Sequence, residues 1–134
     1  MRDRDRELIA AIRAQHRETF GTGRLRTRYK RCHEIAATAL ISGTAPPADA
    51  VLVQGIDRTV YGVSREHSWL ELPDGRLWDP VTCELDTLRP QVIVARYTCE
   101  QARSKLLETG FWGWWSGPSA LREVQLREAS EEQR

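Results

Sequence analysis

The stretch that most restricts the fold of this chain is residues 67–80, HSWLELPDGRLWDP. Bulky apolar side chains alternate with polar ones on both sides of Pro73-Asp74-Gly75, a pattern typical of two antiparallel strands joined by a turn. Proline sets φ for the first turn position, and glycine can adopt the left-handed conformation of a three-residue loop with a bulge. The sequence therefore predicts a β-hairpin with a three-residue loop.

The length of this loop decides which side chains share a face. The predicted pairs are Leu72 with Arg76, Glu71 with Leu77, and Trp69 with Asp79. His67 then lies diagonally beside Asp79, on the same face and within side-chain reach. A two-residue loop would place the two side chains on opposite faces. The turn chemistry thus favours an imidazole beside a carboxylate, as a general base and its orienting group require.

A candidate nucleophile lies upstream, where Cys32 immediately precedes a run of helix-forming residues, 33–41. A cysteine in the first turn of a helix lies near the positive end of the helix dipole, and Lys30 and Arg31 add positive charge. These features favour the thiolate. Cys32, His67 and Asp79 therefore form a candidate catalytic triad.

These motifs resemble the core of the transglutaminase-like and papain-like cysteine enzymes, over roughly residues 31–82. The order is a cysteine opening a helix of small residues, then His67-Ser68-Trp69, then Asp79-Pro80, as in small bacterial and phage members of that superfamily. The resemblance implies that Cys32 is the nucleophile, His67 the general base and Asp79 the orienting residue. No upstream glutamine matches the oxyanion donor of papain.

Composition limits the class of protein. The chain has 134 residues, 40% hydrophobic and 29% charged, which fits one globular domain. Its net charge of +1 gives no general attraction to nucleic acid. No apolar run is long enough to span a membrane, and the amino terminus is too charged for a signal peptide, so we expect a cytoplasmic protein. In that reducing compartment we expect its three cysteines to be free thiols.

The remaining elements follow from local patterns. We expect an amphipathic helix at 6–20, a basic segment at 24–31 and an alanine-rich helix at 32–41. Strands are expected at 51–56, 59–63 and 91–95, beside the hairpin. Thr98 and Gln101 form a capping box for a helix that ends at Gly110, and the tail from 119 is helical to about 128, with 130–134 frayed. The core spans about 24–115, within a single domain of 1–134.

The predicted fold is α+β, with an antiparallel sheet packed against the alanine-rich helix that carries the cysteine nucleophile. Within it, Glu71 is an alternative orienting residue, ranked below Asp79 because it lies further from the open end of the hairpin. His33 projects about 100° away from Cys32 around a helix, which makes it a poor base. A metal site would need distant residues such as Cys83 and Cys99 to converge, so we expect no metal and no cofactor.

Tryptophans near these motifs are candidates for substrate contact. Trp112 and Trp114 belong to the aromatic segment that follows Gly110, and Trp69 lies next to the histidine strand. Large apolar side chains in a small domain more often pack in the core. For Trp69 in particular we favour a wall that shields His67 from water.

The sequence thus predicts a cysteine-dependent enzyme that acts on amide bonds of a peptide or protein substrate. Water as the acceptor gives a thiol protease or deamidase, and an amine gives a transamidase; the sequence leaves both open, as it does the oligomeric state. A toxin-like effector delivered to another cell is a special case. The alternative is a non-catalytic binding or assembly protein on the same scaffold, including one encoded by a phage, whose contact surface is the basic segment and the aromatic cluster.

Overall fold

The computed structural model describes residues 7, 10, 31–42, 49–59, 61–82, 84–111, 114–116 and 119–132. Apart from Glu7, Ala10 and Arg31, the helix predicted at 6–20 and the basic segment at 24–31 lie outside the described residues. Cys83 and Trp112 lie outside them as well.

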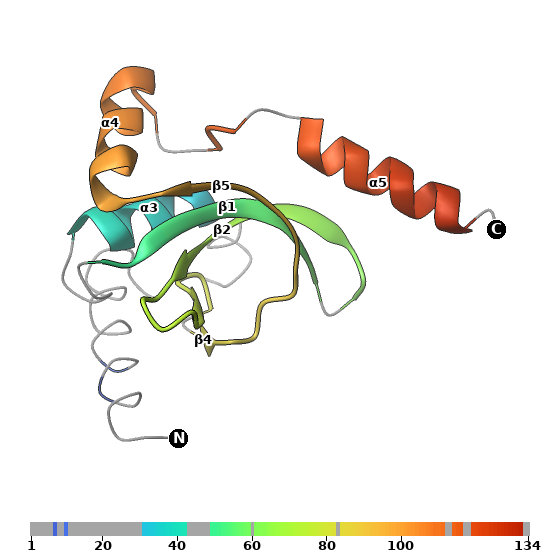
Figure 1. Ribbon diagram of the computed structural model, residues 1–134, viewed down its shortest axis with the longest axis horizontal. Coiled ribbons are helices and arrows are strands. Elements are labelled where there is room, and N and C mark those ends of the chain that lie inside the picture. Colours follow the sequence, from blue (N-terminus) through green and yellow to red (C-terminus); the bar gives the residue numbers. More distant parts are fainter. Residues whose placement is uncertain are drawn as a thin grey trace.

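In the described part of the chain, five strands form one antiparallel sheet (Figure 1). They are β1 (Val51–Arg58), β2 (Ser64–Glu71), β3 (Leu77–Asp79), β4 (Glu84–Leu85) and β5 (Pro90–Tyr97). Their spatial order is β4-β3-β2-β1-β5, so β1 and β2 are flanked on both sides. The prediction of an α+β protein with an antiparallel sheet is confirmed.

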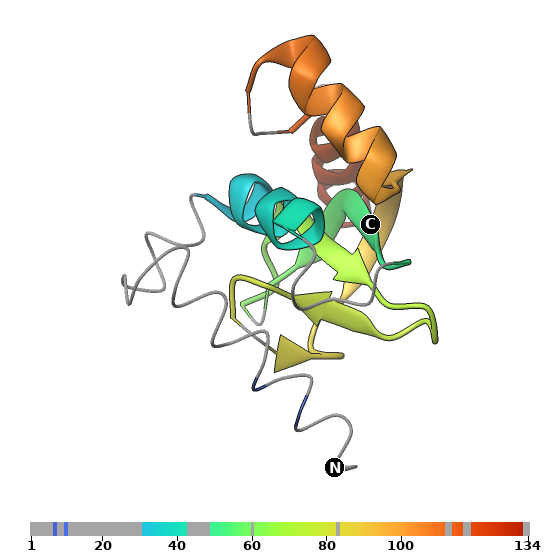
Figure 2. The ribbon, with the colours of Figure 1, turned by 90° about the vertical axis from the view of Figure 1, so that its left-hand side faces the viewer.

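The three helices among the described residues are α3 (Cys32–Ser42), α4 (Cys99–Thr109) and α5 (Ser119–Glu132). Helix α3 packs on β1 and β2, and α4 packs against α3 and against β1 and β5. Figures 1 and 2 show α3 and α4 side by side, with α5 at the opposite end of the long strands.

The main core lies between α3, α4 and one face of the sheet. Its buried residues are Ala36, Ala37, Leu40, Ala50, Leu52, Leu70, Leu72, Trp78 and Ala102. Leu52, Leu70 and Trp78 are neighbours across β1, β2 and β3. Alanine side chains on α3 allow the helix to approach these large residues closely, and each buried leucine contributes roughly 2 kcal/mol.

The β2–β3 hairpin has the predicted loop. Glu71 pairs with Leu77, and the Leu72 N–H donates to the Arg76 carbonyl at 2.8 Å. The Gly75 N–H donates to the Leu72 carbonyl at 2.9 Å, with Gly75 at φ 87°. The predicted register and the left-handed glycine are therefore confirmed.

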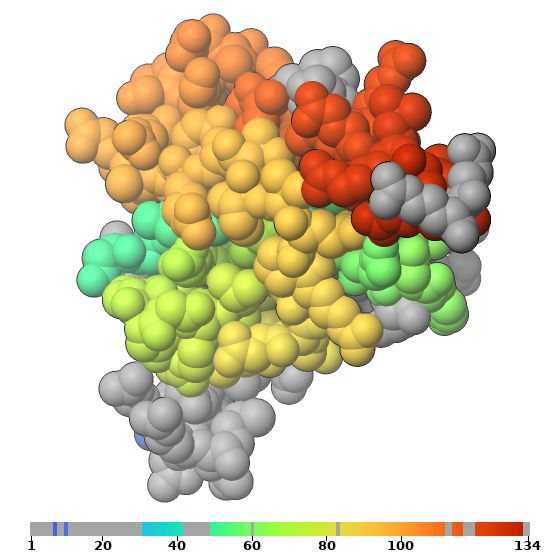
Figure 3. Space-filling model, turned by 45° about the vertical axis from the view of Figure 1, so that its right-hand side comes forward, coloured from blue at the N-terminus to red at the C-terminus, as the bar shows by residue number. Residues whose placement is uncertain are grey.

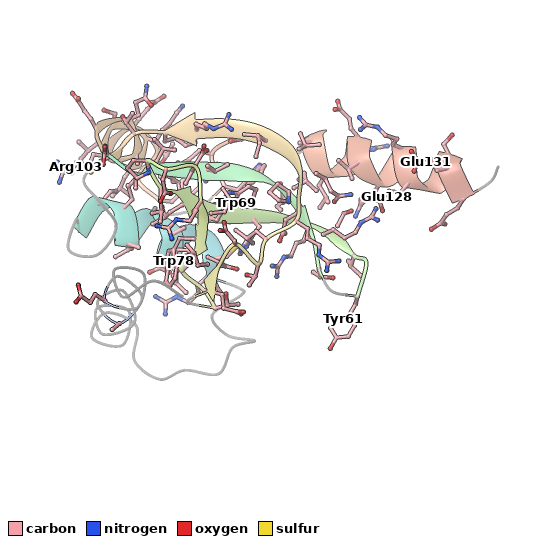
Figure 4. All side chains as sticks on the ribbon, turned by 60° about the horizontal axis from the view of Figure 1, so that its bottom comes forward. Tyr61, Trp69, Trp78, Arg103, Glu128 and Glu131 are labelled. Carbon is pink, nitrogen blue, oxygen red and sulfur yellow. The ribbon has the colours of Figure 1, made fainter. Side chains whose placement is uncertain are left out.

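The strand predicted at 59–63 is wrong, because the described residues of this run form the turn between β1 and β2. The Gly62 N–H donates to the Thr59 carbonyl at 2.9 Å, and Gly62 has φ 79°. Tyr61 is 90% exposed and points away from the sheet at the tip of this turn (Figure 4). The local preference for β structure is overridden by a glycine that reverses the chain.

Helix α4 has the predicted capping box, with the Gln101 N–H donating to Thr98 Oγ1 and the Thr98 N–H donating to the Gln101 side chain. Gly110 follows it at φ 72°. Helix α5 continues to Glu132, so the fraying predicted from residue 130 is wrong for residues 130–132. The physical reason is an anchor near the end of the helix, at Glu128.

Glu128 attaches α5 to the end of the long strands. Its carboxylate accepts hydrogen bonds from Ser64, from Gln91 at 3.0 Å and from Arg58 at 3.2 Å. The hydrogen bond from Ser64, together with those from Gln91 and Arg58, lowers the pKa of this carboxyl. Figure 3 shows α5 (red) resting on the end of the β1–β2 hairpin (green).

Candidate active site

Asp79 is the last residue of β3, and both of its carboxylate oxygens are engaged. Oδ1 accepts the Val81 N–H at 2.9 Å in a turn that passes through Pro80. Oδ2 lies 3.2 Å from His67 Nε2. Only 2% of Asp79 is exposed, so the carboxylate is held in one orientation. The predicted proximity of His67 and Asp79 is confirmed.

The His67 ring is completely buried beside Trp69, with ring centroids 6.0 Å apart and an interplanar angle of 30°. Trp69, which is labelled in Figure 4, is itself completely buried and passes so close to β1 that a Cβ on Gly55 would lie 2.8 Å from its Cη2. The indole therefore forms a wall beside His67, and it offers no surface to a substrate in this structure.

Cys32 is the first residue of α3, as the sequence predicts. The residue is 6% exposed and packs against Ile35 and Val81. Two histidines, His33 and His67, lie close enough to its thiol to act on its acidity. The structure thus brings together the three residues of the predicted triad, in the order Cys32, His67 and Asp79.

The electrostatics of Cys32 and His67 favour an ion pair. Burial raises the pKa of the Cys32 thiol, but hydrogen bonds and charges from His33 and His67 outweigh it and lower the pKa to about 6. Burial lowers the pKa of His67, whereas Asp79 and Cys32 raise it to about 9. Between these values the stable form is a thiolate beside an imidazolium.

Arg31 does not supply the positive charge that the sequence suggested. Its guanidinium donates to both carboxylate oxygens of Glu34, at 2.8 and 2.9 Å. The negative charge of Glu34, in the first turn of the helix, therefore offsets the positive charge of Arg31. The thiolate of Cys32 is therefore favoured by the two histidines.

The amino end of α3 lies at the edge of β2. The ladder pairs between β2 and β3 are Leu70 with Trp78 and Glu71 with Leu77. Consecutive strand residues point to opposite faces, yet Cys32 contacts His67 and His33 contacts Ser68. Two consecutive helix residues thus reach both faces of one strand, at the end where β3 has stopped.

His33 lies close to the thiol of Cys32, which its angle around the helix did not suggest. Its side chain acts on the acidity of that thiol, its Nδ1 lies 2.6 Å from Ser68 Oγ, and its ring lies 5.4 Å from that of Trp114. The angle of about 100° around the helix is correct, but both directions are occupied by strand β2. Only the path of β2 past the helix, which the sequence does not encode locally, makes this arrangement possible.

Gln54 is a second residue that sequence reasoning missed. It is completely buried, and its Oε1 accepts the Trp115 N–H at 3.0 Å and the Ser116 hydroxyl at 2.9 Å. These bonds fix the short segment that carries Trp114 to His33. A glutamine in an apolar strand was the available signal, because a buried amide must find hydrogen-bond partners.

No family model, curated protein or solved structure matches this chain. The function proposed below therefore rests on the geometry of its own residues. That geometry selects Asp79 over Glu71 beside His67, because the Glu71 carboxylate accepts from Arg96 Nε at 3.0 Å.

The other candidate ligands do not converge on a metal site. Cys99 is a free thiol whose Sγ lies 3.7 Å from the Leu40 carbonyl, near the far end of α3 from Cys32. Among the residues that the structure describes, no three His, Cys, Asp or Glu side chains gather closely enough to hold a metal ion. None of the described helices is long and apolar enough to cross a bilayer.

A polar pocket of about 670 Å³ has Asp79 in its lining. Its lining includes Asp57 and Arg65, which form an ion pair at 2.9 Å. Cys32 is absent from the lining, so this pocket is not the path by which a substrate reaches the thiol.

Proposed function

We propose that this chain is a cysteine-dependent enzyme that acts on amide bonds, in a peptide or in a glutamine side chain, through an acyl-thioester on Cys32. One observation carries the proposal: Cys32, His67 and Asp79 are buried together, His67 lowers the pKa of the Cys32 thiol, and Asp79 faces His67 Nε2 while it accepts the Val81 N–H. A nucleophile, a base and an orienting carboxylate in this order are what acyl transfer requires.

In the proposed mechanism, His67 gives away one proton and later takes one back. The Cys32 thiolate attacks the amide carbonyl carbon, the new C–S bond forms, and the carbonyl electrons move to an oxyanion near the Cys32 N–H. The oxyanion collapses, the C–N bond breaks, and the His67 imidazolium gives its proton to the leaving nitrogen. The neutral imidazole then takes a proton from the incoming water or amine, which attacks the thioester and releases the thiolate.

Asp79 supports these steps without exchanging a proton. Its carboxylate is held by the Val81 N–H and faces Nε2 of His67, so the imidazolium is stabilised and its orientation is fixed. Because Nε2 is engaged by Asp79, Nδ1 is the ring nitrogen that serves the reaction. The proposal includes peptidase or deamidase activity with water and transamidase activity with an amine.

The test uses a small activated acyl donor, because Cys32 is only 6% exposed. The wild-type protein is incubated with p-nitrophenyl acetate, and the acetylated peptides are identified by mass spectrometry. We expect acetyl transfer to Cys32, and loss of this product in Cys32→Ala but not in the matched variant Cys99→Ala. Acetylation of Cys32 no faster than in the urea-unfolded protein would contradict the proposal.

The burial of the site favours one rival function. Cys32 is 6% exposed and His67 completely buried, as expected for a binding or assembly protein that keeps the scaffold without turnover. The enzyme and the binding protein differ in whether a carbonyl group of a substrate can reach the Cys32 thiol. Acetylation of Cys32 in the folded protein supports the enzyme, and alkylation by iodoacetamide without any acetylation supports the rival.

A further inference from the structure

We infer that His33 is a second functional histidine of this site, whose ring, fixed by Ser68 and Trp114, donates a hydrogen bond to the oxyanion formed on the acyl group bound to Cys32. This inference rests on the proposed acyl-transfer function. It supplies the side-chain donor that the sequence did not reveal.

The position of His33 is set by two neighbours, Ser68 and Trp114. Its Nδ1 lies 2.6 Å from the hydroxyl of Ser68, which is completely buried in β2. On another side, its ring lies 5.4 Å from the ring of Trp114 at an angle of 54°. Trp114 is itself fixed because Gln54 binds the next two residues, Trp115 and Ser116. The ring is thus held by contacts from both a strand and the aromatic segment.

The hydrogen bond with Ser68 determines where His33 carries its proton. A buried hydroxyl whose hydrogen has no acceptor destabilises the folded protein. The Ser68 O–H therefore donates to Nδ1 of a neutral His33 ring. The remaining hydrogen of that ring is then on Nε2. A protonated ring also carries a hydrogen on Nε2. In both forms, therefore, His33 presents Nε2–H as a donor.

The two histidines have partners of different chemistry, which separates their roles. His67 faces the carboxylate of Asp79, which stabilises an imidazolium and suits a group that exchanges protons. His33 faces the neutral hydroxyl of Ser68, which fixes a tautomer and suits a group that keeps its proton. His67 therefore moves protons, and His33 is a stationary donor.

The location of the oxyanion follows from the location of the sulfur. His33 follows Cys32 directly at the start of α3 and lies close enough to act on its thiol, and the oxyanion forms on the carbon that becomes bonded to that sulfur. A donor this close to the sulfur is within reach of this oxygen. The Cys32 backbone N–H, at the start of α3, has no partner within the helix and provides the second donor.

The experiment compares two reactions of Cys32, only one of which passes through an oxyanion. Acetylation by p-nitrophenyl acetate forms a tetrahedral oxyanion, whereas alkylation by iodoacetamide does not. Both rate constants are measured over a range of pH and divided by the thiolate fraction obtained from the alkylation profile. This division removes the effect of His33 on the acidity of the thiol.

Two substitutions of His33 separate the donor from the packing. His33→Phe keeps a ring against Trp114 but removes the donor, and His33→Gln keeps an N–H donor in a similar position. We expect His33→Phe to slow acetylation per thiolate about 10²-fold, with alkylation per thiolate changed less than about threefold. His33→Gln should restore most of the lost acetylation rate.

A third variant, Ser68→Ala, keeps the test valid if either substitution of His33 causes misfolding. Ser68→Ala removes only the hydroxyl that fixes the ring, so it should lower the ratio of acetylation to alkylation in the same direction by a smaller factor. An unchanged ratio in both His33→Phe and Ser68→Ala would overturn the inference while leaving Cys32 as the nucleophile. Absence of acetylation in the wild-type protein would instead overturn the proposed function, and this inference with it.

Discussion

Gln54 and Ser68 lie directly opposite each other in the β1–β2 ladder, and their buried side chains hold two different parts of the site. Gln54 binds the backbone of Trp115 at 3.0 Å, and Ser68 Oγ lies 2.6 Å from His33 Nδ1. One cross-strand pair thus fixes both the aromatic segment and the first turn of α3. The site is anchored to the two strands that are flanked on both sides.

Replacing Gln54 by leucine should loosen the aromatic segment. The change keeps an apolar side chain of similar size but leaves the Trp115 N–H and the Ser116 hydroxyl without this acceptor. We expect a loss of about 1–3 kcal/mol in the free energy of unfolding in urea. Gln125→Leu, on the exposed side of α5, is the matched control and should change stability by less than about 0.5 kcal/mol. Equal effects of the two substitutions would contradict this role of Gln54.

Replacing Gly55 by alanine should damage the sheet beside Trp69. The added Cβ would lie 2.4 Å from the Val92 carbonyl oxygen, a backbone atom that cannot move without breaking the β1–β5 ladder. We expect destabilisation of at least about 3 kcal/mol. Gly75→Ala has open space around it and only the cost of a positive φ, about 1–2 kcal/mol. Chemical denaturation of both variants checks this order, and a larger loss for Gly75→Ala would show that the packing at Gly55 is misassigned.

Replacing Asp79 by asparagine should lower the pKa of His67. The value of about 9 depends on burial opposed by the hydrogen bonds and charges of Asp79 and Cys32, and the substitution removes one of those charges. NMR titration of the His67 ring measures the shift directly. Glu71→Gln should leave the pKa unchanged, because Glu71 pairs with Arg96. The opposite result would make Glu71 the orienting residue.

The Cys32–His67 pair should contribute little pH dependence to stability. The pKa of His67 is raised from 6.5 to about 9, so this residue stabilises the fold fully below pH 6.5. That contribution is lost as the pH rises through 9. The pKa of Cys32 is lowered from 9.0 to about 6, so this residue stabilises the fold fully above pH 9.0. That contribution is lost as the pH falls through 6. Because the two contributions change over nearly the same interval in opposite directions, they cancel to within about 1 kcal/mol.

This cancellation is measured as the difference in unfolding free energy between the wild type and the double variant Cys32→Ala, His67→Ala, from pH 6 to 9. We expect a nearly constant difference. A fall of about 3 kcal/mol with rising pH would mean that His67 alone is shifted, and a rise of similar size would mean that Cys32 alone is shifted.

Local chemistry made the hairpin predictable. The loop at Pro73-Asp74-Gly75 fixes its register within a few residues, and the register places His67 beside Asp79. The capping box of α4 is equally local. In both cases the residues that specify the structure are the residues that adopt it.

Contacts between distant segments were not predictable in this way. His33 reaches Ser68, 35 residues away, only because the amino end of α3 lies at the edge of β2. Gln54 binds Ser116 across 62 residues. Nothing near His33 or Gln54 in the sequence records these partners, so the helical angle of His33 was right and its surroundings were missed.

The ion pair between Cys32 and His67 is tested most directly by the pH dependence of thiol alkylation. Iodoacetamide is applied to the folded protein across the acidic and neutral range, and mass spectrometry of the peptides separates Cys32 from Cys83 and Cys99. Limited exposure of Cys32 lowers the rate by the same factor at every pH and leaves the midpoint unchanged. We expect a midpoint at about pH 6 for Cys32 in the folded protein, and one near pH 8.5 after unfolding in urea. The same midpoint in both states would contradict the thiolate–imidazolium pair on which this account depends.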